Sequence, residues 1–201
     1  MLKKILIGAL SLLLVSLPGK AAVIALWDFE DETTSTSYSA DSGSGTLGTF
    51  TGTQSIGTDA GNEFLDFSTG GSFIIHVSGT GFTDFQVTYQ AQKNGMSPSV
   101  TWGWSTTGSG FVTTGVSPGS DTPGSSFSTF FVQSFPSDLN NVSDVYLQAS
   151  FGSAVDFDNI SVSGVPEPVN VALACFGVAF VGLTFGRRVY AMARSQRAVI
   201  A

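Results

Sequence analysis

The chain has 201 residues, of which only 11% are charged, and this length allows one domain once terminal segments are set aside. Between residues 21 and 165, the chain has 14 acidic residues and only one lysine or arginine, Lys93, so this stretch has a formal charge of −13. Such a charge would repel the phosphate groups of a nucleic acid and argues against a nucleic-acid partner. The only cysteine, Cys175, excludes an intrachain disulfide and a metal site built from cysteines.

The N-terminus has the parts of an export signal in order. Lys3 and Lys4 precede an apolar run of 13 residues over 5–17, and a helix-breaking Pro-Gly pair separates this run from Ala21. Spanning about 30 Å of hydrocarbon takes about 20 residues, so the run is too short for an anchor and is typical of a cleaved Sec signal. We therefore predict a signal peptide over residues 1–21, with the Sec translocon and signal peptidase as partners.

The body, residues 22–164, shows the two-residue period of strands and no convincing helical periodicity. Apolar and polar residues alternate most cleanly over 83–92. The pattern predicts strands over 23–29, 47–50, 73–77, 83–92, 99–105, 127–135, 143–151 and 157–163. Such a series without helices predicts an all-β fold, an antiparallel β-sandwich.

Two connections in the body have their own signals. Residues 30–61 are rich in Ser, Thr and Gly, so we expect a long loop there, broken only by the short strand at 47–50. Asn94-Gly95 lies between two alternating segments and predicts a hairpin that joins 83–92 to 99–105.

The C-terminus predicts a membrane anchor. Val165-Pro166-Glu167-Pro168 precedes an apolar stretch over 169–186, and Arg187 and Arg188 follow at once. At about 1.5 Å per residue, a helix over 169–186 has about the minimum length that crosses a bilayer. By the positive-inside rule, the two arginines stop transfer, the tail over 189–201 lies in the cytoplasm and the body lies outside.

This order of motif, apolar helix and arginines resembles the PEP-CTERM sorting domain over residues 165–188. The resemblance implies a sorting motif formed by Val165, Pro166, Glu167 and Pro168. It also implies that an exosortase, a membrane-embedded cysteine transpeptidase-like protease, processes the chain after one C-terminal helix has held it at the inner membrane. The destination would be the cell surface or an exopolysaccharide matrix. A plain linker ahead of a permanent anchor is the alternative.

Segments at both ends of the body carry a second resemblance. Trp27-Asp28-Phe29-Glu30 and Phe157-Asp158-Asn159-Ile160 are similar to segments of the jelly-roll or concanavalin-like sandwiches found in PEP-CTERM proteins and carbohydrate-binding modules. The resemblance implies that the first and last strands are neighbours, and that Glu30 and Asp158 help to hold a structural calcium ion. Calcium takes about six to eight oxygen ligands, so two carboxylates do not complete a site, and solvated or turn-capping roles are the alternative.

Other residues suggest chemistry less directly. Trp102 and Trp104 share one face of a strand, and we expect them, like Tyr89, to lie in the core rather than to form a sugar-stacking platform. His76 is the only histidine, and no nucleophile or orienting partner can be identified for it. The acidic pairs Asp28–Glu30 and Asp156–Asp158 could suggest a glycosidase, but no second flanking acid at the required distance can be identified for either pair.

We therefore expect a non-enzymatic surface or matrix protein, with polysaccharide as the expected partner of its body. Two alternatives stay open. A glycan-binding module with a defined site would show an exposed aromatic residue on a concave sheet. A glycoside hydrolase-like enzyme would show a groove lined by two carboxylates.

Overall fold

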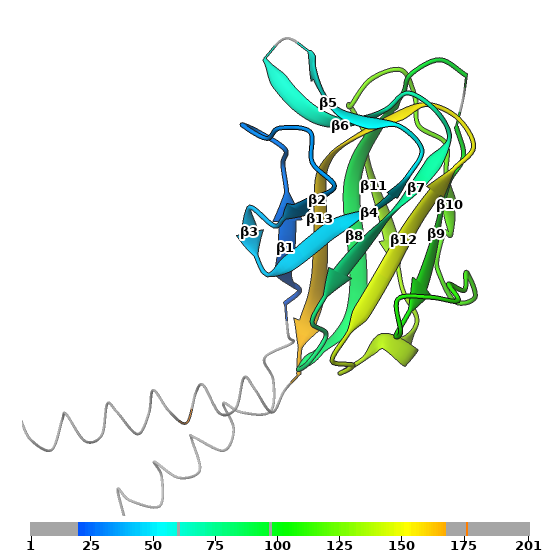
Figure 1. Cartoon of the computed structure of the whole chain (residues 1–201). Helices are drawn as coiled ribbons and strands as arrows, with labels where there is room; N and C mark the ends of the chain where they lie inside the picture. Colours follow the sequence, from blue (N-terminus) through cyan, green and yellow to red (C-terminus); the bar gives the residue numbers. More distant parts are fainter. Residues whose placement is uncertain (1–19, 60, 97, 168–175, 177–201) are drawn as a thin grey trace, which may run out of the picture. The chain divides into compact units, whose positions relative to one another are not determined.

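The computed structural model describes residues 20–59, 61–96, 98–167 and 176 (Figure 1). Most of the predicted signal peptide, Pro168, the stop residues Arg187 and Arg188, and the 169–186 segment apart from residue 176 lie outside these residues. No helix in the described part is long and apolar enough to cross a membrane. Residues 20–165 form one compact unit, which contains the predicted sandwich.

The described residues form two β-sheets that pack face to face (Figure 1). The first sheet has the order β11-β8-β13-β1-β3, with the β5–β6 hairpin attached to β13, and the second has the order β10-β9-β12-β7-β4-β2. The strands are β1 (Ala22–Trp27), β2 (Ser37–Ser39), β3 (Ser42–Gly43), β4 (Gly45–Thr51), β5 (Gln54–Asp59), β6 (Asn62–Phe67), β7 (Gly71–Val77), β8 (Phe82–Lys93), β9 (Val100–Ser105), β10 (Ser120–Asp121), β11 (Phe130–Ser134), β12 (Val145–Phe151) and β13 (Val155–Pro166), with one 3-10 turn, η1 (Ser137–Leu139).

Eight of these strands have the order of a jelly roll. β11-β8-β13-β1 run side by side in the first sheet, and β10-β9-β12-β7 run side by side in the second. β1 pairs with β13 in antiparallel register, with Ala22 opposite Gly164, which confirms that the first and last strands are neighbours. We call β1 and β7–β13 the framework, and we call residues 28–70, which carry β2–β6, the insertion.

The core lies between the two sheets and is rich in aromatic rings. Tyr89, Trp102 and Phe157 are each fully buried, and the ring centroids of Phe73 and Phe157 are 5.0 Å apart. The expectation that Tyr89 and Trp102 lie in the core is therefore confirmed. Trp104 is only partly buried against the core, and its indole Nε1 donates to the carbonyl of Thr114 at 3.0 Å.

The predicted hairpin at Asn94-Gly95 is wrong. β8 lies in the first sheet and β9 in the second, so the connection crosses from one layer of the sandwich to the other. Their apolar faces meet across the core, where the rings of Tyr89 and Trp102 are 5.3 Å apart. Alternation identifies which face of a strand is buried but not which strand lies beside it, and this explains the error.

The strand predicted at 47–50 is confirmed, since it lies within β4, but the long loop predicted around it is wrong, because that segment also contains β2, β3 and β5. These strands are short, rich in Ser, Thr and Gly, and mostly exposed on one side, so they carry little of the alternating pattern. They form because the outer strands of both sheets offer unpaired backbone groups. β4 pairs with β7 on one sheet, and β3 pairs with β1 on the other.

The last strand continues into the predicted sorting motif. β13 ends at Pro166, and the carbonyl of Val165 accepts a hydrogen bond from the hydroxyl of Thr83 at 3.3 Å. Glu167 follows the strand and is half-buried. The first half of the motif is thus extended backbone that begins within the sandwich.

Candidate functional site

The outer face of the second sheet brings together residues that are far apart in the sequence. His76 on β7 lies opposite Tyr146 on β12 and opposite Thr46 on β4. Because successive side chains alternate between the two faces of a strand, and Ile75 and Leu147 point into the core, all three side chains point outward. They form one row across the junction between the insertion and the framework.

His76 and Tyr146 form an aromatic stack at this face. Their ring centroids are 4.3 Å apart, and their planes differ by 7°. His76 Nε2 is also 3.1 Å from Asp144 Oδ1, which gives the ring the partner that the sequence did not reveal. Hydrogen bonds from the Ser143 hydroxyl and from His76 lower the pKa of the exposed Asp144 carboxyl. The His76 side chain remains 40% exposed, so the stack is accessible.

A pocket of about 370 Å³ lies beside the stack. Two of its lining residues are glycines at which a side chain would be crowded: a Cβ on Gly48 would lie 3.1 Å from Ser37 Cβ, and a Cβ on Gly108 would lie 3.3 Å from the Tyr146 ring. The residues that line the pocket are Thr36, Ser37, Thr46, Gly48, Thr49, Ile74, His76, Gly108 and Tyr146.

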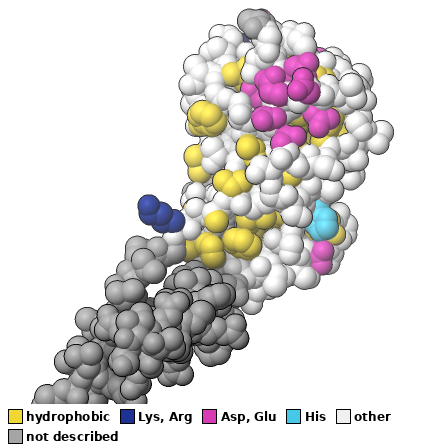
Figure 2. Space-filling view, turned by 90° about the vertical axis from the view of Figure 1, so that its left-hand side faces the viewer, with side chains coloured by type: hydrophobic (Ala, Val, Ile, Leu, Met, Phe, Trp, Pro, Cys, Tyr) yellow, Lys and Arg dark blue, Asp and Glu magenta, His cyan; other side chains and the backbone are white. Residues whose placement is uncertain are grey.

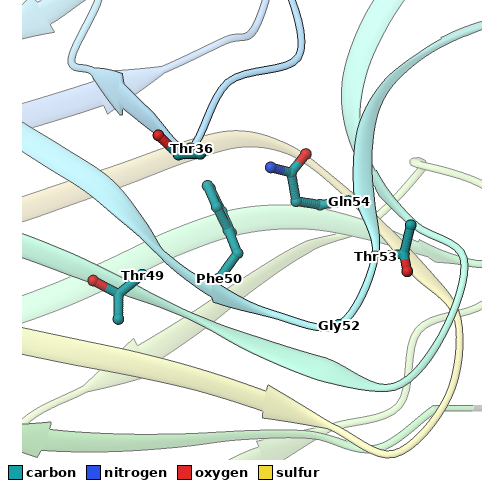
Figure 3. Close-up of a pocket in the computed structure, with 6 residues that line it drawn as sticks. All are labelled: Thr36, Thr49, Phe50, Gly52, Thr53 and Gln54. Carbon is teal, nitrogen blue, oxygen red and sulfur yellow. The ribbon is translucent and has the colours of Figure 1, made fainter.

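A second pocket, of about 580 Å³, adjoins the first within the insertion (Figure 3). The two pockets share Thr36 and Thr49, and the second is completed by Phe50, Gly52, Thr53 and Gln54. Figure 3 shows the Phe50 ring extending toward Thr36 and Gln54.

An irregularity in β4 shapes the boundary between the pockets. The register against β7 shifts between Gly48 and Thr51, and Thr49 has a φ of 51°, a left-handed conformation that is rare for a β-branched residue. As a result Leu47 and Phe50, three residues apart, both pack toward the core, and Thr49 is placed where the pockets meet. No sequence signal marks this bulge.

The lining of both pockets is neutral in a domain that is otherwise strongly acidic. Its side chains supply hydroxyl groups, one amide and an aromatic wall, and they include no Asp, Glu, Lys or Arg. Hydroxyl and amide groups both donate and accept hydrogen bonds, so this surface suits a ligand that is rich in hydroxyl groups and has a flat apolar face.

The predicted calcium ligands Glu30 and Asp158 lie near one another, on the insertion and the last strand. Asp158 is 2% exposed, and burial, with a contribution from the Glu30 charge, raises its pKa. Both Asp158 oxygens accept N–H groups: Oδ1 from the Asn159 backbone at 2.7 Å, and Oδ2 from the Asn62 amide at 3.0 Å. Among the residues that the structure describes, no three acidic, His or Cys side chains gather as a metal site. A calcium ion at this pair stays a prediction, and the N–H donors already facing Asp158 do not favour it.

The other acidic residues considered as catalytic pairs lie away from both pockets. The Asp28 carboxylate accepts the backbone N–H of Glu30 at 3.3 Å, which is the contact of a turn-capping side chain. Asp156 lies on the outer face of the first sheet, opposite Asp66. Neither pocket is lined by a carboxylate, and the expectation that the chain is not an enzyme stays a prediction.

The strand order defines the class of this domain as a jelly-roll β-sandwich, and a pocket lies on the outer face of its second sheet. No family model matches the chain, and no curated protein matches its sequence, so membership of the PEP-CTERM family stays a prediction.

Solved structures with a related arrangement include the CBM22-1 xylan-binding domain of Paenibacillus barcinonensis Xyn10C, with 9% identity and a TM-score of 0.46 over 75% of this chain and 99% of that one. TmCBM61 in complex with β-1,4-galactotriose has 9% identity and a TM-score of 0.38 over 57% of this chain and 87% of that one. An isomalto-dextranase of Arthrobacter globiformis T6, complexed with panose, has 12% identity and a TM-score of 0.40 over 58% of this chain. This chain spans only 22% of that enzyme's length. With TM-scores below 0.5, these likenesses carry no argument, and the fold assignment rests on the strand order.

Proposed function

We propose that the sandwich is a non-catalytic carbohydrate-binding domain that takes a neutral glycan chain on the outer face of its second sheet. The observation that carries the proposal is the His76–Tyr146 stack, which stands beside a pocket lined by hydroxyl groups. An aromatic face packs against the apolar face of a pyranose ring, while Thr and Ser hydroxyls exchange hydrogen bonds with sugar hydroxyls.

The acidic charge of the body favours a neutral glycan over an acidic one. The body carries one lysine against 14 acidic residues, so uronate or sulfate groups would meet a repulsive field as they approach. No Asp, Glu, Lys or Arg side chain lines either of the two pockets. A neutral polysaccharide avoids that repulsion and still finds hydrogen-bonding partners along both pockets.

The test is the affinity of the full chain, purified in mild detergent, for an array of neutral and acidic polysaccharides. We expect binding to neutral glycans, and we expect Tyr146→Ala to weaken it by about tenfold or more, since Tyr anchors commonly dominate binding energies. Tyr146→Phe keeps the ring and should keep most of the affinity.

The matched control is Phe130→Ala, which removes an aromatic ring that is 58% exposed on β11, in the other sheet. It should leave the affinity unchanged. Wild-type affinity in Tyr146→Ala, or a loss of affinity in Phe130→Ala, would contradict the proposed site.

We also infer that the protein is exported and that an exosortase processes it after transient anchoring in the inner membrane. The support is the order of sequence features: an export-signal pattern over 1–21 at one end, and Val165-Pro166-Glu167-Pro168, the apolar stretch over 169–186 and Arg187-Arg188 at the other. The glycan-binding body would then reach the cell surface or extracellular matrix. Mass spectrometry of the mature protein from its native host tests this, because an intact C-terminus extending past Arg188 would leave only a single-span anchor.

A further inference from the structure

The contact between Asp144 and His76 fixes the position of a hydrogen on the histidine ring. Asp144 Oδ1 is 3.1 Å from His76 Nε2, and Asp144 Oδ2 accepts the Ser143 hydroxyl at 2.7 Å. Hydrogen bonds from Ser143 and from His76 lower the pKa of Asp144, so its carboxyl group is ionised at neutral pH. Because an ionised carboxylate only accepts hydrogen bonds, Nε2 is the nitrogen that carries the hydrogen between the two groups.

The other ring nitrogen of His76, Nδ1, is open to a ligand. In a neutral imidazole, the nitrogen without the hydrogen is a hydrogen-bond acceptor. Within the described part of the chain, Nδ1 makes no hydrogen bond, and the atom is not buried. Figure 2 shows the histidine at the surface, outside the group of acidic side chains that gathers on the same face of the molecule. Because His76 lines the pocket beside the aromatic stack, Nδ1 adds an acceptor to the wall of that pocket.

This acceptor differs from every other polar side-chain group of the pocket. Among the described residues that line it, the remaining polar side chains all carry hydroxyl groups, on Thr36, Ser37, Thr46, Thr49 and Tyr146. A hydroxyl group rotates and both donates and accepts, so it pairs with a donor or with an acceptor of the ligand. Nδ1 of the Nε2–H form only accepts. It therefore discriminates between a ligand hydroxyl and a group that has no hydrogen to donate.

We propose that His76 is a specificity-determining residue whose Nδ1 accepts a hydrogen bond from one free hydroxyl of the glycan, and that Asp144 is the positioning residue that holds the ring in the Nε2–H form. This inference rests on the proposed glycan binding and narrows its ligand class. Asp144 does not line the pocket, so it acts through His76. A glycan that is O-methylated or deoxygenated at that hydroxyl leaves Nδ1 unpaired, and a site built around a hydroxyl disfavours such an analogue.

The tautomer of His76 gives a readout that does not depend on the glycan. It can be measured from the ¹⁵N chemical shifts of the ring in the full chain, in mild detergent. We expect the Nε2–H form in the wild type and in Asp144→Glu, which keeps a carboxylate at a position that is 51% exposed. Asp144→Ala should show an added fraction of the Nδ1–H form. A wild-type ring with its hydrogen on Nδ1 would overturn the proposal.

Glycan affinity tests the role of Nδ1 itself. The probes are neutral hexasaccharides of glucose, xylose and mannose, each with its O-methylated form. His76→Phe keeps an aromatic ring beside Tyr146 but has no Nδ1, so it should bind the best hexasaccharide about three- to tenfold more weakly, the effect of one net hydrogen bond. Its preference for the free over the O-methylated sugar should also fall. Asp144→Ala should change both quantities in the same direction, and Asp144→Glu should restore them.

Asp138→Ala is the matched control for the loss of one negative charge. Asp138 is an exposed residue of η1 that lines neither pocket, so its removal should leave affinity and preference unchanged. If the hexasaccharides bind and Tyr146→Ala weakens them, but His76→Phe and Asp144→Ala bind like the wild type, glycan binding stands and this inference alone is wrong. If no hexasaccharide binds the wild type, the proposed function fails and this inference fails with it.

Discussion

The framework and the insertion differ in how many of their side chains are buried in the core. Framework strands such as β8 and β12 bury every second side chain along most of their length. Insertion strands β2 and β5 bury little and are held mainly by backbone pairing to neighbouring strands. The pocket beside the aromatic stack nevertheless needs both regions, since His76 belongs to the framework while Thr49 belongs to the insertion.

This difference indicates that the two regions have different roles in the domain. The framework supplies most of the regular buried strands, and the polar insertion supplies part of the lining of the first pocket and all of the lining of the second. Surface segments placed on a rigid scaffold commonly carry function for this reason.

The largest expected effect is in the framework core. Phe157→Ala removes a fully buried ring that packs on Phe73 and Phe151, and it should cost about 3–5 kcal/mol of unfolding free energy. Phe50→Ala, in the insertion, removes a partly buried ring and should cost about 1–2 kcal/mol. Urea unfolding of the full chain measures both losses of unfolding free energy. Equal losses in the two variants would contradict the claim that the framework is more tightly packed than the insertion.

A smaller effect is expected where β3 meets β1. Gly43 and Gly61 both have left-handed φ angles, of 84° and 90°. A Cβ on Gly43 would lie 2.0 Å from the carbonyl oxygen of Ile24, whereas a Cβ on Gly61 meets nothing within 4 Å. Gly43→Ala should therefore lose about 1–3 kcal/mol more stability than Gly61→Ala, measured by thermal unfolding. Equal losses would mean that the β1–β3 contact is looser than the structure shows.

The Thr49 bulge predicts a change of opposite sign. Asn tolerates the left-handed region better than a β-branched residue, so Thr49→Asn should stabilise the protein by about 0.5–1 kcal/mol. Thr88→Asn, in the regular framework strand β8, should destabilise it instead, because Asn is unfavourable in strands. Denaturant midpoints of the two variants give the comparison, and the same sign in both would contradict the assigned strain.

The smallest effect concerns Asp144, beside the aromatic stack. Ser143→Ala removes the hydroxyl that contributes most to the lowered pKa, so the pKa of Asp144 should rise toward its ordinary value, while Ser143→Thr should keep it low. NMR titration of the Asp144 carboxyl measures this change. Because the folded-state pKa is depressed, the associated stability is present above the ordinary pKa of 3.8 and is lost as the pH falls through the folded value. If the pKa of Asp144 is unchanged in Ser143→Ala, the Ser143 hydroxyl is not what lowers it.

The sequence predicts the framework because its strands alternate. Phe85, Val87 and Tyr89 fall on one face of β8, and all three are buried. The insertion escapes prediction because segments such as Gly45–Thr51 combine Gly and Thr with a bulge that breaks the two-residue period.

The site escapes prediction for another reason. His76 and Tyr146 are 70 residues apart in the sequence. Only the strand register brings them together. Periodicity shows that each residue faces outward but not which residue lies opposite.

The most direct test of glycan binding across the framework–insertion junction is NMR chemical-shift mapping of the full chain during titration with a neutral oligosaccharide. The account predicts saturable shifts at His76 and Tyr146 in the framework, and at Thr46 and Gly48 in the insertion. Phe130 and Thr88, on the outer face of the other sheet, should not shift. Shifts confined to that other face, or no saturable shifts with any neutral oligosaccharide, would contradict it.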